Sequence, residues 1–153
     1  MANTFSQIYL QFVFAVQNRQ SVIAKEHKEE LHKYITSLVQ HRKAKMLAIN
    51  CMPDHIHLFV GFRPTILISD FVKEIKVESN DFINGKDWVK GKFSWQEGYG
   101  VFSYSQSHID KVVKYVLNQE AHHQKRTFKQ EYLELLKRFE LQYDERYVFD
   151  FFD

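Results

Sequence analysis

The apolar residues of this chain change their spacing in an order that few folds can accommodate. Residues 8–17 carry large apolar side chains at every second position, which predicts a strand, because side chains alternate between the two faces of a strand. The spacing then predicts a helix at 21–43, strands at 46–52 and 55–62, a helix at 69–83, and one or two short strands within 93–105. This β-α-β-β-α-β order predicts an α+β fold of the ferredoxin-like, split βαβ type, an antiparallel sheet with helices on one face.

Extra helices are expected after this unit. Ser107, with Asp110 at the offset of a capping box, is expected to open a third helix, and 127–139 forms a fourth. The C-terminal segment is rich in aromatic residues, which are expected to pack either at a subunit interface or on the chain's own core: Tyr143, Tyr147, Phe149, Phe151 and Phe152. Because the chain has 153 residues and no linker-like stretch, we expect 1–153 to form a single domain.

Composition excludes several classes of protein. The formal net charge of +2 is too small to indicate nucleic-acid binding by itself. Cys51 is the single cysteine, so the chain can form neither an internal disulfide nor a cysteine-based zinc site, and we expect a reducing, cytoplasmic setting. We expect no signal peptide and no membrane-spanning segment, because no apolar stretch is long enough.

Two histidines in the third predicted strand are candidate metal ligands. His55 and His57 are two residues apart, so the alternation of a strand places both imidazoles on one face. Neutral imidazoles are ligands for divalent metals, and such a pair offers half of a site. An incidental or purely structural pair remains the alternative.

A tyrosine in the third predicted helix is a candidate nucleophile. At about 100° per residue, Tyr115 lies roughly 130° from the centre of the apolar stripe of its helix, so its helix does not bury it. Gln119 follows one turn later on the same face, and its amide oxygen suits Mg²⁺ or Mn²⁺. Together with the histidine pair, these residues would suit transesterification of a phosphodiester. A surface tyrosine, or one packed against another subunit, is the alternative.

Three motifs resemble those of HUH single-tyrosine transposases, the TnpA-type enzymes of the IS200/IS605 group. They are MPDHIHL at 52–58, WQEGYG at 95–100, and YVLNQ at 115–119 followed by His122 and His123. The resemblance implies that His55, His57 and Gln119 bind Mg²⁺ or Mn²⁺ and that Tyr115 is the nucleophile. It also implies single-stranded DNA with subterminal hairpins as substrate, a 5′-phosphotyrosine intermediate, a free 3′-hydroxyl, a homodimer, and no nucleotide cofactor.

Basic residues near these motifs are candidate DNA contacts, because they would neutralise phosphates. They form two groups: Lys111, Lys114, Lys125 and Arg126 near the tyrosine, and Lys86, Lys90 and Lys92 interleaved with Trp88 and Phe93. Aromatic rings between basic residues suit stacking on unpaired bases. A solvated helix face and a core position for Trp88 are the alternatives. His122 is a candidate accessory residue, three positions after Gln119.

Two other functions compete with the transposase. A nucleotide hydrolase of the histidine-triad class would need a further histidine at position 59, where this chain has Phe59. A non-catalytic module that binds DNA hairpins, such as a domesticated descendant, would leave the pairing of Tyr115 with Gln119 unexplained.

Overall fold

The computed structural model describes residues 4–19, 22–123 and 126–141. Its strands are β1 (Ile8–Ala15), β2 (Lys45–Met52), β3 (His55–Phe62) and β4 (Gly100–Tyr104). Its α-helices are α1 (Lys28–His41), α2 (Ile68–Gly85), α3 (Ile109–Leu117), α4 (Gln119–His123) and α5 (Phe128–Arg138). The predicted order of strands and helices is therefore confirmed.

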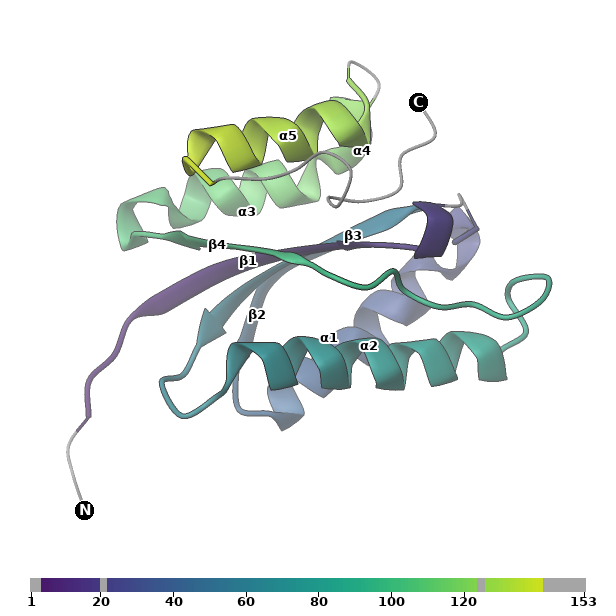
Figure 1. Cartoon of the computed structure of the whole chain (residues 1–153). Helices are drawn as coiled ribbons and strands as arrows, with labels where there is room; N and C mark the ends of the chain where they lie inside the picture. Colours follow the sequence, from purple (N-terminus) through teal and green to yellow (C-terminus); the bar gives the residue numbers. More distant parts are fainter. Residues whose placement is uncertain (1–3, 20–21, 124–125, 142–153) are drawn as a thin grey trace.

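All four strands pair antiparallel in the order β2-β3-β1-β4, which confirms the ferredoxin-like α+β fold. Helices α1 and α2 cover one face of the sheet, and α3, α4 and α5 lie over the other (Figure 1). The strand alternation decides what each layer buries. Phe12, Phe14 and Leu58 point into the large core under α1 and α2, whereas Val13 and Ala15 pack under α5.

Helix α1 begins later than the spacing predicted. Residues 22–24 have no regular structure and Lys25–His27 form a 3₁₀ turn, so the α-helix begins at Lys28. The expected extended region 93–105 contains one strand, β4, and a separate bridge between Trp95 and Val16. Gly98, with φ +85°, takes a left-handed conformation between the two and separates them.

The predicted capping box at Ser107 is wrong. Gln106–His108 form a 3₁₀ turn, and α3 begins at Ile109 without a side-chain cap. The Ser107 hydroxyl instead lies within hydrogen-bonding distance of Ser105 and His108. A capping box does form at the start of α5, between Thr127 and Gln130.

Helix α3 also ends earlier than expected, so Tyr115 and Gln119 lie in two consecutive helices. Asn50 of β2 explains this end. Its Nδ2 donates to the carbonyl oxygens of Val116 and Leu117, at 2.9 and 3.2 Å, which helices leave without an intrahelical partner at their C-termini. The sheet therefore terminates the helix that carries the tyrosine.

The aromatic C-terminal residues from Tyr143 onward lie outside the described part of the chain, so their expected packing stays a prediction. Among the described residues, no helix combines the length and the apolar character needed to cross a membrane.

Helix α5 approaches the sheet closely at Gly100. A Cβ added there would lie 2.5 Å from the hydroxyl of Tyr132 and 3.0 Å from a ring carbon of Phe102. Both rings are buried in the cluster beneath α5, so they have little room to move. We therefore expect Gly100→Ala to displace α5 and to lower the free energy of unfolding by about 1–3 kcal/mol in urea denaturation. Gly85→Ala is the matched control, because nothing lies within 4 Å of its added Cβ; equal stability of the two variants would contradict the prediction.

Candidate active site

The two histidines lie on the face of β3 that the C-terminal helices cover. His55 and His57 pair with Ala15 and Val13 of β1, and their ring centroids are 5.2 Å apart. Their exposed fractions are 1% and 0%. The strand alternation thus places both imidazoles together, as predicted from their spacing. Phe59 is the next residue on this face, at the position where the histidine-triad class would need a further histidine. Its side chain packs against Val112 and Val116 of α3.

One nitrogen of each imidazole is held by an oxygen acceptor. Nδ1 of His55 lies 2.7 Å from Oδ1 of Asp54, and Nδ1 of His57 lies 2.9 Å from Oε1 of Gln11. Gln11 in turn donates from Nε2 to the Tyr104 hydroxyl at 2.9 Å, which orients its amide. These contacts favour the tautomer with the proton on Nδ1, so both Nε2 atoms present a lone pair to the interior of the site.

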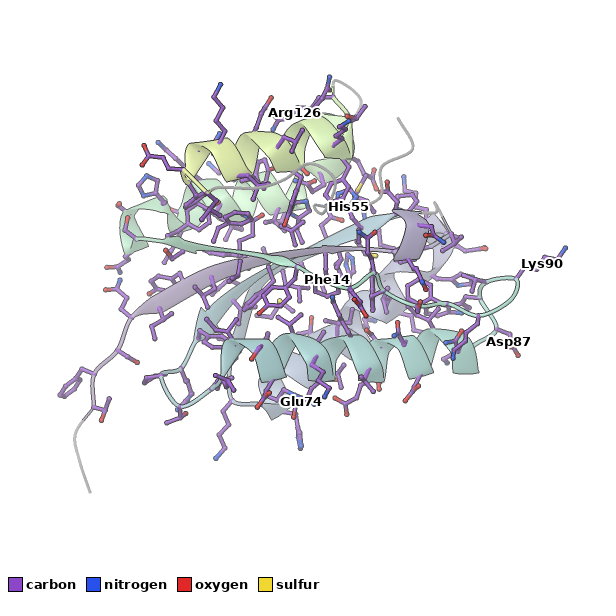
Figure 2. All side chains as sticks on the ribbon, in the orientation of Figure 1. Phe14, His55, Glu74, Asp87, Lys90 and Arg126 are labelled. Carbon is purple, nitrogen blue, oxygen red and sulfur yellow. The ribbon has the colours of Figure 1, made fainter. Side chains whose placement is uncertain are left out.

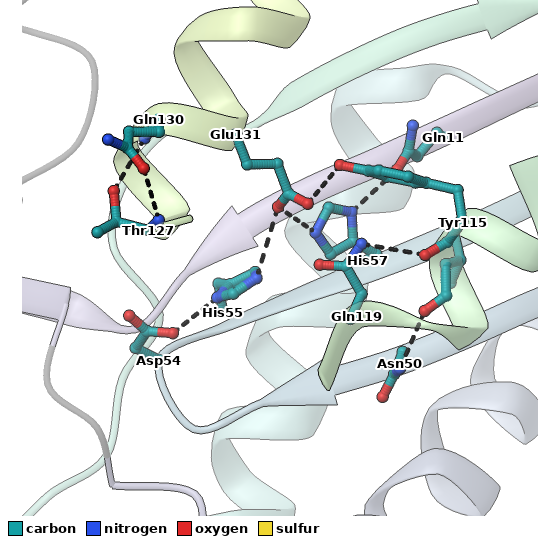
Figure 3. Close-up of polar contacts among 11 residues, drawn as sticks. Gln11, Asn50, Asp54, His55, His57, Tyr115, Gln119, Thr127, Gln130 and Glu131 are labelled. Atoms are coloured by element: carbon teal, nitrogen blue, oxygen red, sulfur yellow. Dashed lines mark hydrogen bonds and ion pairs between the residues drawn. The ribbon is translucent and has the colours of Figure 1, made fainter. Parts of the chain in front are cut away.

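A buried carboxylate faces these two nitrogens. Oε1 of Glu131, from α5, lies 3.1 Å from Nε2 of His57 and 3.9 Å from Nε2 of His55 (Figure 3). Glu131 is 1% exposed. A carboxylate and two lone pairs that converge away from water repel one another unless a cation or protons lie between them. The ligand atoms of the three residues lie within 4.8 Å of one another, and this donor set fits a divalent metal ion.

The sequence analysis missed Glu131, although the chain carried a signal for it. The buried apolar residues of α5 are Phe128, Tyr132, Leu135 and Leu136, and Glu131 lies on the face that they define. A charged residue within the apolar face of a helix needs a polar partner, so such a position indicates a buried site.

Tyr115 lies beside the histidine pair of its own chain. Its ring centroid is 5.9 Å from that of His57, and its hydroxyl donates a hydrogen bond to Oε2 of Glu131. Burial raises the pKa of Tyr115 above its usual range, and the charge of Glu131 and their hydrogen bond raise it further. The tyrosine is half-buried, because α5 covers the side that α3 leaves open. The periodicity of α3 alone could not show this.

Gln119 is fully buried at the start of α4, and its Nε2 donates to the backbone oxygen of Tyr115 at 3.2 Å. Figure 3 shows it among the same polar side chains as His57 and Tyr115. This hydrogen bond holds the tyrosine and the glutamine together across the break between α3 and α4. The side chain of His122 lies outside the described part of the chain.

The basic residues do not form one surface. Lys111 and Lys114 are exposed on α3, whereas Lys90 and Lys92 are exposed on the loop after α2. Lys90 lies well away from Arg126 (Figure 2). Ion pairs engage Lys86 with Glu30 and Arg126 with Glu134, and Lys125 lies outside the described residues.

The aromatic rings between the second group of lysines belong to the protein interior. Phe93 is buried, and Trp88 packs on the core and stacks on His27 with centroids 4.4 Å apart. This agrees with the alternative that places Trp88 in the core.

The chain is similar to known transposases. A sequence model of the family described as "Transposase IS200 like" matches residues 4–119. The ISDra2 transposase TnpA of Deinococcus radiodurans is 24% identical over 118 residues, which cover 74% of this chain and 84% of that protein.

Two solved structures share the fold. A crystal structure of a protein from Deinococcus radiodurans R1, assigned as a transposase, has a TM-score of 0.62 and 23% identity and covers 78% of this chain and 95% of its own. A REP-associated tyrosine transposase bound to a REP hairpin has a TM-score of 0.59 and 17% identity, covering 80% of this chain and 73% of its own. The family match ends at residue 119, so it includes the histidines and the tyrosine but not Glu131.

Proposed function

The chain belongs to the family of IS200-like transposases, and from this premise we propose that it cuts and rejoins single-stranded DNA through a covalent bond to Tyr115. The observation that carries the proposal is the position of the Tyr115 hydroxyl, which contacts a carboxylate that also faces His55 and His57. A nucleophile beside a cluster of metal-ligating side chains suits metal-assisted phosphoryl transfer through a covalent intermediate.

The cluster would hold Mg²⁺ or Mn²⁺. Nε2 of His55 and of His57 would supply two nitrogen ligands, and Glu131 and Gln119 would supply oxygen ligands. When bound, such a metal polarises the phosphodiester and stabilises the charge that develops on it. Gln11 and Asp54 would keep both imidazoles oriented toward it.

In the proposed reaction the Tyr115 oxygen attacks phosphorus and the bond from phosphorus to O3′ breaks. The products are a 5′-phosphotyrosine and a free 3′-hydroxyl. The phosphotyrosine conserves the energy of the broken bond, so a 3′-hydroxyl can attack it and reseal a strand without a nucleotide cofactor.

We propose single-stranded DNA with subterminal hairpins as the substrate, because the solved REP-associated relative is bound to a hairpin. Lys111 and Lys114, exposed on the helix of the tyrosine, are the proposed phosphate contacts. Moving a DNA segment needs cuts at both ends, and each chain offers one proposed nucleophile, so we propose that a homodimer acts.

A covalent-trapping assay tests the proposal. The protein is incubated with labelled single-stranded oligonucleotides that tile the flanks of its gene, with Mg²⁺ or Mn²⁺, and resolved on a denaturing gel. We expect a protein–DNA adduct that chelator abolishes and that duplex DNA yields poorly, because pairing and stacking must be broken before a strand can enter a site buried this deeply. Hairpin binding without an adduct from any oligonucleotide would contradict cleavage and would favour the non-catalytic hairpin binder.

A further inference from the structure

We propose that Glu131 is a catalytic residue that accepts the proton of the Tyr115 hydroxyl during strand cleavage. The inference rests on the proposed role of Tyr115 as nucleophile and adds a residue that lies beyond the family match. It is based on the two contacts that the carboxylate of Glu131 makes, one through each of its oxygens. Oε2 accepts the hydrogen bond from Tyr115, and Oε1 faces Nε2 of His57 at 3.1 Å.

The reaction needs such an acceptor. A phenol has a pKa of about 10, so at neutral pH the tyrosine carries its proton when it meets the phosphodiester. The proton must leave as the bond to phosphorus forms, and a base in hydrogen-bond contact lowers that barrier. Glu131 already makes this contact, whereas the imidazoles use Nδ1 for Gln11 and Asp54 and direct Nε2 toward the proposed metal.

Helix α5 holds the carboxylate firmly in place. The capping box of Thr127 and Gln130 starts the helix, which puts Glu131 in its first turn. Phe128 stacks on His55 with ring centroids 3.9 Å apart, and Tyr132 packs against Gly100 of β4. Residues on both sides of Glu131 therefore anchor it to the sheet that carries the histidines, which is the preorganisation that a general base needs.

The step balances with the groups present. The Tyr115 proton moves to Oε2 of Glu131, the tyrosine oxygen bonds to phosphorus, the bond to O3′ breaks, and water protonates the departing O3′. During rejoining, a 3′-hydroxyl attacks phosphorus and gives its proton to solvent, and protonated Glu131 returns its proton to the tyrosine oxygen as the bond from that oxygen to phosphorus breaks. One carboxylate thus serves as base in cleavage and as acid in resealing.

Glu131→Gln tests the proposal, because it retains shape and an oxygen toward the histidines but removes the base. At saturating DNA, we expect single-turnover adduct formation to fall about 10²–10⁴-fold. Mn²⁺ binding, measured by calorimetry without DNA, should persist. Glu134→Gln, an exposed carboxylate on the same helix, is the matched control and should keep the wild-type rate.

A second experiment tests whether the rate depends on removal of the Tyr115 proton by a base. Fluorotyrosine at position 115 has a more acidic phenol and depends less on a base, so it should restore part of the rate lost in Glu131→Gln. Recovery of Glu131→Gln by excess Mn²⁺ alone would overturn the proposal, since the carboxylate would then be only a ligand. An unchanged or faster rate would also overturn it, and a faster rate would mean that α5 obstructs the site. If the wild-type protein formed no adduct, the role of Tyr115 would fail and that of Glu131 with it.

Discussion

Tyr115→Phe abolishes the covalent protein–DNA adduct: this is the largest effect that we expect from a single substitution. Phenylalanine keeps the ring that faces His57 but has no oxygen to attack phosphorus. We expect no detectable adduct on a denaturing gel, while hairpin binding in a native gel stays within a few-fold of wild type. An adduct at the wild-type rate would show that another residue is the nucleophile.

The same variant also reports on the contact with Glu131. The lost hydroxyl donates to a buried carboxylate, and removal of such a donor costs about 1–3 kcal/mol of stability. Urea denaturation should therefore show a small loss in the free energy of unfolding, and the slope of that free energy against urea concentration should stay unchanged. Tyr34→Phe is the matched control. Tyr34 stacks on Phe82 on the opposite side of the sheet, and its substitution should leave the adduct unchanged.

His57→Ala should remove metal binding and cleavage together. His57 is fully buried, and Gln11 holds its Nδ1 so that Nε2 points toward Glu131. Without it, three of the four proposed ligands remain, and the site loses one of its two nitrogen donors. Wild-type protein at a Mn²⁺ concentration of about 100 Kd should gain roughly 2.7 kcal/mol of stability, seen as a higher melting temperature. His57→Ala should gain none and should form no adduct.

Two further variants serve as controls for this test. His57→Asn keeps a polar side chain and covers the case in which the cavity of His57→Ala prevents folding. His41→Ala removes an exposed histidine at the end of α1 and should retain both the Mn²⁺ shift and the adduct. Adduct formation by either His57 variant in the presence of chelator would contradict a metal role for the histidine pair.

Local rules of chain geometry were sufficient to predict much of the fold and part of the candidate site. The period of two placed His55 and His57 on one face, and the order of spacings predicted the ferredoxin-like sheet. Tyr115 and Gln119 are also in contact, as their spacing predicted, although the single helix expected for them divides at Asn118. These features depend on residues a few positions apart, and their geometry follows from the backbone itself.

The capping box expected at Ser107 fails for the opposite reason. Gln106–His108 form a 3₁₀ turn, so α3 begins only at Ile109, and the Ser107 hydroxyl lies near Ser105 and His108 instead of capping it. At the other end of the same helix, Asn50 of β2 binds the last carbonyl oxygens, and nothing within 107–119 encodes this distant partner. Tertiary contacts override weak local preferences in this way because capping and propensity each contribute only about 1 kcal/mol.

By itself, the sequence determined the order of strands and helices along the chain, the histidine pair and the tyrosine–glutamine pair. Only the tertiary structure decided that α5 folds back over the sheet, partly buries Tyr115 and brings Glu131 to His57, 74 residues away in sequence. The periodicity of α5 could mark a charged residue on its apolar face but could not identify the partner. A buried carboxylate is tolerated only where distant donors or a cation meet it, so its role depends on long-range packing rather than on local pattern.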